Sequence, residues 1–143
     1  MPSDFALKGM NTVHRILMKA SFNKFGWTAA KMPVVELTTT GRKSGRLHTV
    51  LLTSPIQVGD TYVIVASRGG DDHHPAWYLN LCAEPKVEAA IKGGPKLPMT
   101  ARVATADERA EWWPKIIATY KNYGAYQTKT SREIPLVALE PAN

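Results

Sequence analysis

The sequence contains a single cysteine, Cys82, among its 143 residues. One cysteine cannot form an intramolecular disulfide, and it cannot supply the several thiolates of a cysteine-based zinc site. The sequence also lacks any run of about 18 consecutive apolar residues, so we expect no membrane-spanning helix. The N-terminus has no continuous apolar core of the kind found in secretory signals. These absences fit a reducing compartment and predict a cytoplasmic protein.

Acidic residues are scarce near the N-terminus. Residues 1–32 carry five basic residues against one acidic residue, Asp4, whereas the other 111 residues are nearly balanced, with 13 basic and 11 acidic residues. Because a nucleic-acid-binding domain gathers basic residues on its folded face, this distribution argues against a nucleic-acid partner. The contents of 44% hydrophobic and 21% charged residues exclude a disordered chain.

The chain divides at Met32-Pro33 into an arm, residues 1–32, and a body, residues 33–143. In the arm, apolar residues recur at helical spacing, and the basic residues fall largely off that stripe. The pattern predicts a basic amphipathic helix, of which residues 5–27 suit the cytoplasmic face of a membrane. A helix that caps the body or meets a partner chain is the alternative, and both interpretations stay open.

The body has the pattern of short β-strands joined by tight turns. Residues 34–40, 49–53, 62–66, 87–91, 99–104 and 135–139 are predicted strands. A short helix is predicted over Ala76–Ala83, and the capping box Thr105-x-x-Glu108 opens a second helix that runs to about Ala118. Strands that outnumber helices predict an α+β, mainly β fold: an antiparallel sheet curled into a barrel, with helices packed outside.

The loop of residues 40–46 joins the first two predicted strands and contains two glycines and three cations. Its glycines permit a tight turn. Backbone N–H groups together with Arg42, Lys43 and Arg46 can hold phosphate or carboxylate groups. The spacing is not that of a P-loop, and a solvated basic turn is the competing interpretation.

A second glycine-rich turn, residues 67–70, ends the third predicted strand and leads toward the predicted helix at Ala76. Such a strand end, followed by the start of a helix, suits an anion or a cofactor. The adjacent His73 and His74 are weak evidence for a metal, and a hydrated loop is favoured, so no metal site is predicted. For Trp77, core packing competes with a role in the site.

Three of the five tyrosines, Tyr120, Tyr123 and Tyr126, recur at every third residue and would share one face of a helix. Each buried phenol needs a hydrogen-bond partner, so the cluster suits a pocket for a flat ring, with one phenol as proton donor. A half-exposed aromatic rim is the alternative. The sequence has no H-E-x-x-H, no nucleophile elbow and no G-x-G-x-x-G. Two cofactor-type loops without a nucleophile point to a borrowed redox cofactor.

Taken together, these motifs resemble the deazaflavin-dependent nitroreductase family of actinobacteria, whose members use coenzyme F420. The similarity runs from about Pro33 to Pro141. The motifs that carry it are L-T-T-T-G-R-K-S-G at residues 37–45, V-A-S-R-G-G at 65–70, P-A-W-Y-L-N-L at 75–81, E-P-K-V at 84–87, Y-x-x-Y-Q at 123–127, and R-x-I-P at 132–135 with the Glu140-Pro141 pair. Each motif is weak alone, but in this order and spacing they are specific.

The resemblance implies a split β-barrel, similar to that of FMN-binding flavin proteins, and a bound F420. Arg42, Lys43 and Ser44 would hold the phosphate and oligoglutamate tail of the cofactor, and residues around Ser67 and Trp77 would flank the ring. The implied cofactor-binding set is Arg42, Lys43, Ser44, Arg46, His48, Thr49, Val50, Leu51, Leu52, Thr53, Val65, Ala66, Ser67, Arg68, Ala76, Trp77, Tyr78, Leu79, Asn80 and Tyr123. The substrate side, with the catalytic groups, would be lined by Tyr120, Tyr123, Tyr126 and Ser67.

The implied reaction is hydride transfer from reduced F420 to a quinone, an activated alkene of the enone or coumarin type, or a nitroaromatic. A membrane-associated arm would suit menaquinone as the acceptor. The sequence departs from the family pattern at His48, where an arginine is usual, and at Leu51, where a proline is usual; histidine is only partly charged near neutrality. The alternative function is a carrier that binds a flavin, a deazaflavin or another ligand without turnover.

Overall fold

The structure, a computed structural model, describes residues 28, 29 and 32–142. The predicted arm of residues 1–32, including the segment 5–27, therefore lies outside the described residues, apart from Thr28, Ala29 and Met32. These three residues belong to β-strands.

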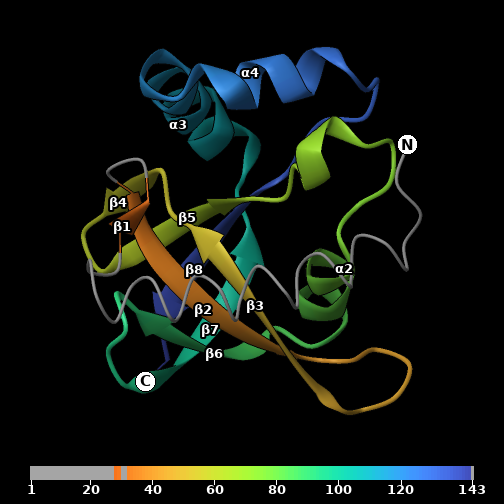
Figure 1. Cartoon of the computed structure of the whole chain (residues 1–143), viewed down its shortest axis with the longest axis vertical. Helices are drawn as coiled ribbons and strands as arrows, with labels where there is room; N and C mark the ends of the chain where they lie inside the picture. Colours follow the sequence, from red (N-terminus) through yellow and green to blue (C-terminus); the bar gives the residue numbers. More distant parts are fainter. Residues whose placement is uncertain (1–27, 30–31, 143) are drawn as a thin grey trace.

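One antiparallel sheet organises the chain (Figure 1). Its strands are β1 (Thr28–Ala29), β2 (Met32–Thr40), β3 (Leu47–Thr53), β4 (Ile56–Val58), β5 (Thr61–Val65), β6 (Lys86–Ile91), β7 (Lys96–Val103) and β8 (Leu136–Pro141). The strand order is β1-β2-β6-β7-β8-β5-β4, and β3 also pairs with β2. The helices are the short 3₁₀ helix η1 (Arg68–Gly70), α2 (Ala76–Ala83), α3 (Ala106–Thr119) and α4 (Lys121–Thr128).

The predicted fold class is confirmed: the antiparallel strands curl as in a split β-barrel, and the helices lie outside the sheet (Figure 1). The predicted bounds of α2 are those observed. The predicted capping box is present at the start of α3, where Thr105 Oγ1 accepts a hydrogen bond from the Glu108 N–H and the Glu108 carboxylate accepts one from the Thr105 N–H. The short strand β4 was not predicted. Helix α3 ends at Thr119, one residue beyond the predicted end near Ala118.

Strands β5 and β8 are covered on both faces, because alternate residues of a strand point to opposite sides. In β5, Ile64 packs with α2 in one core cluster, and Val63 and Val65 pack with α3 and α4 in a second cluster. In β8, Val137 belongs to the first cluster and Leu136 to the second. Burial on both faces explains why these strands are almost continuously apolar in the sequence. It also fixes the loops at their ends relative to α2 and α4.

Among the described helices, none combines the length and the apolar character needed to span a bilayer. The described residues also contain no cluster of three or more histidine, cysteine, aspartate or glutamate side chains placed to hold a metal ion.

Candidate functional site

The β2–β3 loop is a tight turn closed by its own backbone. The Gly41 N–H donates to the Arg46 carbonyl over 2.7 Å, and the Gly45 N–H donates to the Gly41 carbonyl over 2.9 Å. Gly45 has φ +73°, a left-handed conformation that glycine adopts without strain. Ser44 Oγ accepts a hydrogen bond from the Arg46 N–H. The side chains of residues 42–48 are exposed, so the cations of this loop face solvent.

Asn80 ties this loop to α2. Its side chain is 5% exposed, and its Oδ1 accepts hydrogen bonds from the Arg42 N–H over 3.2 Å and from Arg42 Nη1 over 2.9 Å. Its Nδ2 donates to Thr39 Oγ1 at the end of β2. A buried amide that uses both its oxygen and its nitrogen in this way fixes its partners, because leaving either atom unpaired would be costly. Arg42 is therefore held at the base of the loop beside α2.

The second predicted loop follows β5 and adopts left-handed backbone conformations in succession. Arg68, Gly69 and Gly70 have φ values of 47°, 65° and 85°. Such values cost a non-glycine residue free energy, so Arg68 needs support from its surroundings. Part of that support is an ion pair from Arg68 Nη1 to Asp71 Oδ2 at 3.1 Å. Burial alone would raise the pKa of Asp71, but hydrogen bonds from His73 and the charge of Arg68 lower it below its usual value.

The loop packs directly on α4. A Cβ atom added to Gly70 would lie 2.7 Å from the carbonyl oxygen of Tyr126 and 3.1 Å from the Cβ of Lys129. A side chain at position 70 would therefore push the loop away from α4. In contrast, a Cβ on Gly69 would meet nothing within 4 Å. The structure thus brings the predicted residues Ser67 and Arg68 next to the helix that carries Tyr126.

Arg132, four residues before the start of β8, contacts the same loop from another side. Its Nε donates to the Asp71 carbonyl over 2.8 Å, and its Nη2 donates to the Ser67 carbonyl over 2.8 Å. Both terminal nitrogens lie 3.3 Å from the Ala66 carbonyl oxygen. Arg132 was one of the residues that carried the family resemblance, but it was not among the predicted site residues.

The tyrosine cluster lies on α4: Tyr120 precedes its first residue, and Tyr123 and Tyr126 are within the helix. Tyr123 is 7% exposed, and its hydroxyl lies 3.4 Å from Thr53 Oγ1 in β3 and 3.8 Å from Met32 Sδ. Burial raises the pKa of Tyr123, so its phenol stays protonated. The rings of Tyr120 and Tyr126 contact that of Tyr123 edge to face, with centroids 6.5 and 6.2 Å away. Tyr126 is only half-buried, which leaves it more accessible than Tyr123.

Several other predicted cofactor residues contribute to the core. Trp77 is 9% exposed and packs in the first core cluster, and Leu51, Val65 and Ala66 are also buried. Thr49 reaches across to β2, where its hydroxyl lies 2.9 Å from that of Thr38. These buried residues support the surface of the candidate site from inside the protein. The cations of the β2–β3 loop, in contrast, are exposed on that surface.

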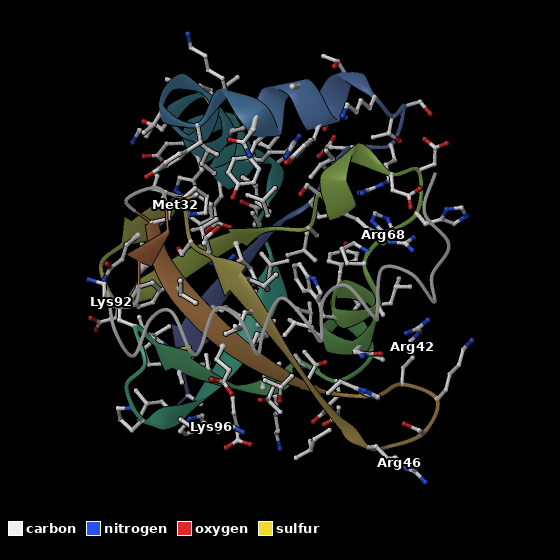
Figure 2. The ribbon with its side chains drawn as sticks, in the orientation of Figure 1. Met32, Arg42, Arg46, Arg68, Lys92 and Lys96 are labelled. Atoms are coloured by element: carbon white, nitrogen blue, oxygen red, sulfur yellow. The ribbon has the colours of Figure 1, made fainter. Side chains whose placement is uncertain are left out.

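Arg68, Arg42 and Arg46 lie along one side of the molecule, with Lys92 on the opposite side (Figure 2). Arg68 and Arg46 stand at the two ends of this row, with Arg42 between them beside α2 (Figures 1 and 2). The two predicted loops are therefore on the same side of the protein. That arrangement suits an elongated anionic ligand better than a compact one.

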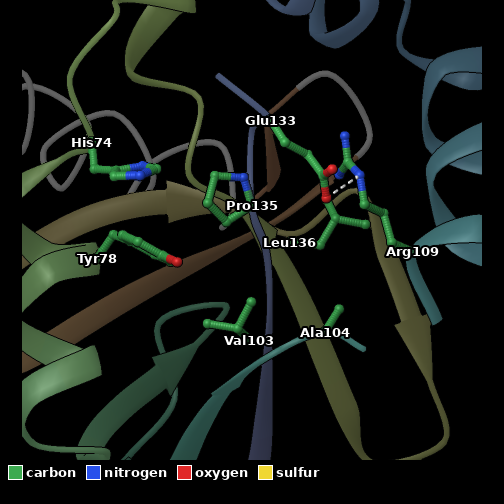
Figure 3. A pocket seen from close by; sticks show the side chains of 8 residues that line it. All are labelled: His74, Tyr78, Val103, Ala104, Arg109, Glu133, Pro135 and Leu136. Atoms are coloured by element: carbon green, nitrogen blue, oxygen red, sulfur yellow. Dashed lines mark ion pairs between the residues drawn. The ribbon is translucent and has the colours of Figure 1, made fainter. Parts of the chain in front are cut away.

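A hollow of about 210 Å³ lies between α2, the end of β7 and the start of α3 (Figure 3). It is lined by His74, Tyr78, Val103, Ala104, Arg109, Glu133, Pro135 and Leu136. Of the predicted site residues, Tyr78 is the one that lines it. Burial, together with Cys82, raises the pKa of Tyr78 to about 12. Burial and the charge of Arg132 lower the pKa of His74.

An ion pair closes one end of this hollow: Arg109 Nε lies 3.0 Å from Glu133 Oε1. At the other end, Arg132 Nη1 lies 3.2 Å from His74 Nδ1. Because a guanidinium can only donate, Nδ1 must accept and the imidazole proton resides on Nε2. Sequence reasoning missed the hollow, because its residues come from four separate segments with no shared pattern.

A comparison with protein families matches residues 10–141 to the family described as F420H(2)-dependent quinone reductase. Among curated proteins, the F420H(2)-dependent quinone reductase Rv1261c of Mycobacterium tuberculosis is 42% identical over 111 residues, which cover 75% of this chain and 72% of that protein.

Two solved structures share the fold at comparable identity. One, titled "Structure of F420-H2 Dependent Reductase (FDR-A)", is 42% identical with a TM-score of 0.65, over 75% of this chain and 93% of the other. The second is described as a domain-swapped dimer and is 38% identical with a TM-score of 0.67, over 90% of this chain and 94% of the other.

Proposed function

The chain belongs to the F420H(2)-dependent quinone reductase family and is an F420-dependent oxidoreductase; on that premise we propose that it reduces a quinone to the hydroquinone. The reaction adds one hydride and one proton to the quinone. F420, when bound in its reduced form, supplies the hydride. The protein supplies binding, orientation and a proton. The observation that carries the proposal is the family match over residues 10–141, together with the cationic row beside α2.

The donor set of the β2–β3 loop fits the tail of F420, which carries a phosphate and several carboxylates. Arg42, Lys43 and Arg46 offer exposed cations on a loop whose backbone is already closed. Asn80 holds one guanidinium nitrogen of Arg42 and leaves the others for a ligand. His48 lies close against Gly41, since a Cβ there would approach its Nε2 to 2.8 Å. His48 therefore lies directly beside the cationic loop.

We assign the ring of the cofactor to the Arg68 end of the cationic row, beside the loop that follows β5 (Figure 2). Ser67 and Arg68 of that loop would flank the ring, with Ala76 and Trp77 at the start of α2. Support comes from the rigid loop, which Arg132 and α4 hold from two sides. A rigid wall beside a reactive ring contributes proximity and orientation, the effects on which hydride transfer chiefly depends.

Tyr126 is our preferred proton donor to the quinone oxygen. Tyr126 is half-buried and lies on the helix that contacts the Ser67 loop. The hydroxyl of its neighbour Tyr123 already contacts Thr53 and Met32. Tyr120, Tyr123 and Ser67 complete the wall on the substrate side. Activated alkenes and nitroaromatics are further acceptors that we propose, because each presents an electron-poor centre to the hydride.

The proposal is tested by steady-state turnover of the purified protein with reduced F420 and menadione, followed by F420 absorbance. We expect turnover with menadione, and a parallel panel with cyclohexenone and a nitroaromatic compares the other acceptors. A protein that binds F420 tightly but reduces none of the three would instead be the non-catalytic carrier.

Lys43→Ala should weaken F420 binding by about 1.5–3 kcal/mol, because it removes a charge-assisted contact to the anionic tail. Binding of F420 should also weaken as salt is raised. Both effects are measured by fluorescence titration. Lys92→Ala, on the opposite side of the molecule, is the matched control and should leave the affinity unchanged. Equal affinities for the two variants, or binding that ignores salt, would remove the β2–β3 loop from the cofactor site.

Tyr126→Phe should lower kcat by roughly 10²–10⁴-fold, the usual contribution of general-acid catalysis, with little change in F420 affinity. Tyr123→Phe should affect kcat less, because its hydroxyl faces Thr53 and Met32. Ser67→Ala tests the competing donor. If these variants and Tyr120→Phe all turn over menadione at the parent rate, water supplies the proton and the tyrosines are only a wall.

We further propose that residues 5–27 bind the surface of an anionic membrane, which would bring the enzyme to a lipid-soluble quinone. The full-length protein should cosediment with phosphatidylglycerol vesicles more than with phosphatidylcholine vesicles. Replacing Lys8, Arg15 and Lys19 together by glutamate should abolish the difference. Cosedimentation that is the same for the parent and the variant would place the arm against protein instead.

A further inference from the structure

We propose that Arg132 is a positioning residue of the reaction: by holding the carbonyl oxygens of Ala66 and Ser67, it aims the Ser67 N–H group at an oxygen that gains negative charge during hydride transfer. The inference rests on the proposed function. The inference adds Arg132, which is not among the predicted site residues, to the proposed site. It also gives a role to the backbone of the loop that follows β5.

The direction of the Ser67 N–H follows from peptide geometry. The described chain contains no cis peptide bond, and in a planar trans peptide the N–H points away from the C=O of the same unit. The Ala66 carbonyl and the Ser67 N–H share one peptide unit. Both terminal nitrogens of Arg132 lie 3.3 Å from that carbonyl oxygen, so the N–H faces the side opposite the guanidinium.

The Ser67 carbonyl is held even more firmly. It accepts a hydrogen bond from Arg132 Nη2 over 2.8 Å and another from the Gly70 N–H over 2.9 Å. Arg132 also binds the Asp71 carbonyl through Nε, so one guanidinium spans the loop from its first residue to its last. The loop includes residues in left-handed backbone conformations, which are not favoured by local energetics alone. The hydrogen bonds from Arg132 therefore keep the peptide planes of the loop in one orientation.

The charge of Arg132 adds an electrostatic effect to the positional one. Its hydrogen bonds go to three carbonyl oxygens and to His74. The adjacent carboxylate of Asp71 pairs with Arg68. A cation on the carbonyl side of a peptide unit polarises that unit and strengthens its N–H as a donor. Fixed dipoles aimed at developing charge are the arrangement that stabilises an oxyanion in enzymes.

The ligand of the Ser67 N–H is therefore the carbonyl oxygen of the quinone, which gains negative charge as the hydride arrives. The deazaflavin also carries a carbonyl oxygen conjugated to its reacting ring, but that ring gives up the hydride and loses electron density. A loss of F420 affinity in Arg132→Gln, with kcat for the quinone unchanged, would overturn the proposal by placing the N–H against the deazaflavin.

Arg109→Gln is the matched control for Arg132→Gln. Arg109 also donates to a backbone carbonyl, that of Ile134 over 2.8 Å, and it is similarly half-buried beside Gln127 and Glu133. Its contacts lie around the hollow and the start of β8, and it is linked to the Arg132 backbone through Gln127, whose Nε2 donates to the Arg132 carbonyl. The two variants therefore remove the same group from neighbouring structural tasks, but only Arg132→Gln removes hydrogen bonds to the carbonyls of the Ser67 loop.

Arg132→Gln should lower kcat with menadione by about 10²-fold, the size of effect that misplaced reacting groups produce. In the cofactor-free protein it should speed amide hydrogen exchange at residues 66–71. Arg109→Gln should lower the thermal unfolding midpoint by a similar amount but keep kcat within about twofold of the parent and leave exchange at residues 66–71 unchanged. Arg132→Lys, which keeps the charge but not the planar fork, should recover thermal stability while most of the loss in kcat persists.

A fall in kcat that is the same in the Arg132 and Arg109 variants would overturn the proposal, as would full recovery of kcat by lysine. Failure of the proposed function is a different result: the parent itself would not reduce menadione. Even then, unchanged exchange at residues 66–71 in Arg132→Gln would show that the guanidinium does not hold the loop.

Discussion

The pairing of β5 with β8 determines where the loop that follows β5 lies relative to Arg132. The register Val65↔Leu136 sets the end of one strand beside the start of the other, and the Ala66 N–H continues the ladder by donating to the Pro135 carbonyl. Because both strands are buried on both faces, a shift of register would expose apolar residues, so the pairing is strongly specified. Ser67 and Arg132, 65 residues apart in sequence, are brought into hydrogen-bond distance by this one constraint.

A second link, independent of the first, joins the β2–β3 loop to the same side of the molecule. Asn80 is anchored by α2, which packs on the sheet through Trp77 and Leu81. From that position it fixes Arg42 and the end of β2. The cationic loop and the loop that follows β5 lie on the same side of the molecule (Figure 2). Their separation can therefore match a ligand with a ring at one end and an anionic tail at the other.

Local patterns in the sequence predicted local structure well. The apolar run between Pro75 and Pro85 gave the bounds of α2, and the threonine–glutamate spacing gave the cap of α3. Strand β7 begins three residues earlier than predicted, since pairing of Lys96 with Ala90 of β6 extends the ladder.

Long-range contacts were beyond a single sequence. Nothing local distinguishes Arg132 from other arginines; its role arises only when β8 lies next to β5. The family resemblance placed Trp77 and Tyr123 at the site, but it could not show that both side chains also fill the core. The hollow at His74 and Tyr78 likewise depends on four segments that meet only in the folded chain.

The two supports of the Ser67 loop come from one stretch of sequence. Tyr126 meets Gly70 through its backbone, and Arg132, six residues later, grips the loop from another side. The phenols of residues 120–126 belong to the same stretch. Under the proposed function, residues 40–53 retain the cofactor, whereas residues 120–135 both wall the substrate side and set the geometry of the loop beside the ring. Substitutions in the first segment then act on affinity for F420, and those in the second act on turnover, with the Thr53–Tyr123 contact as a direct tie between the two segments.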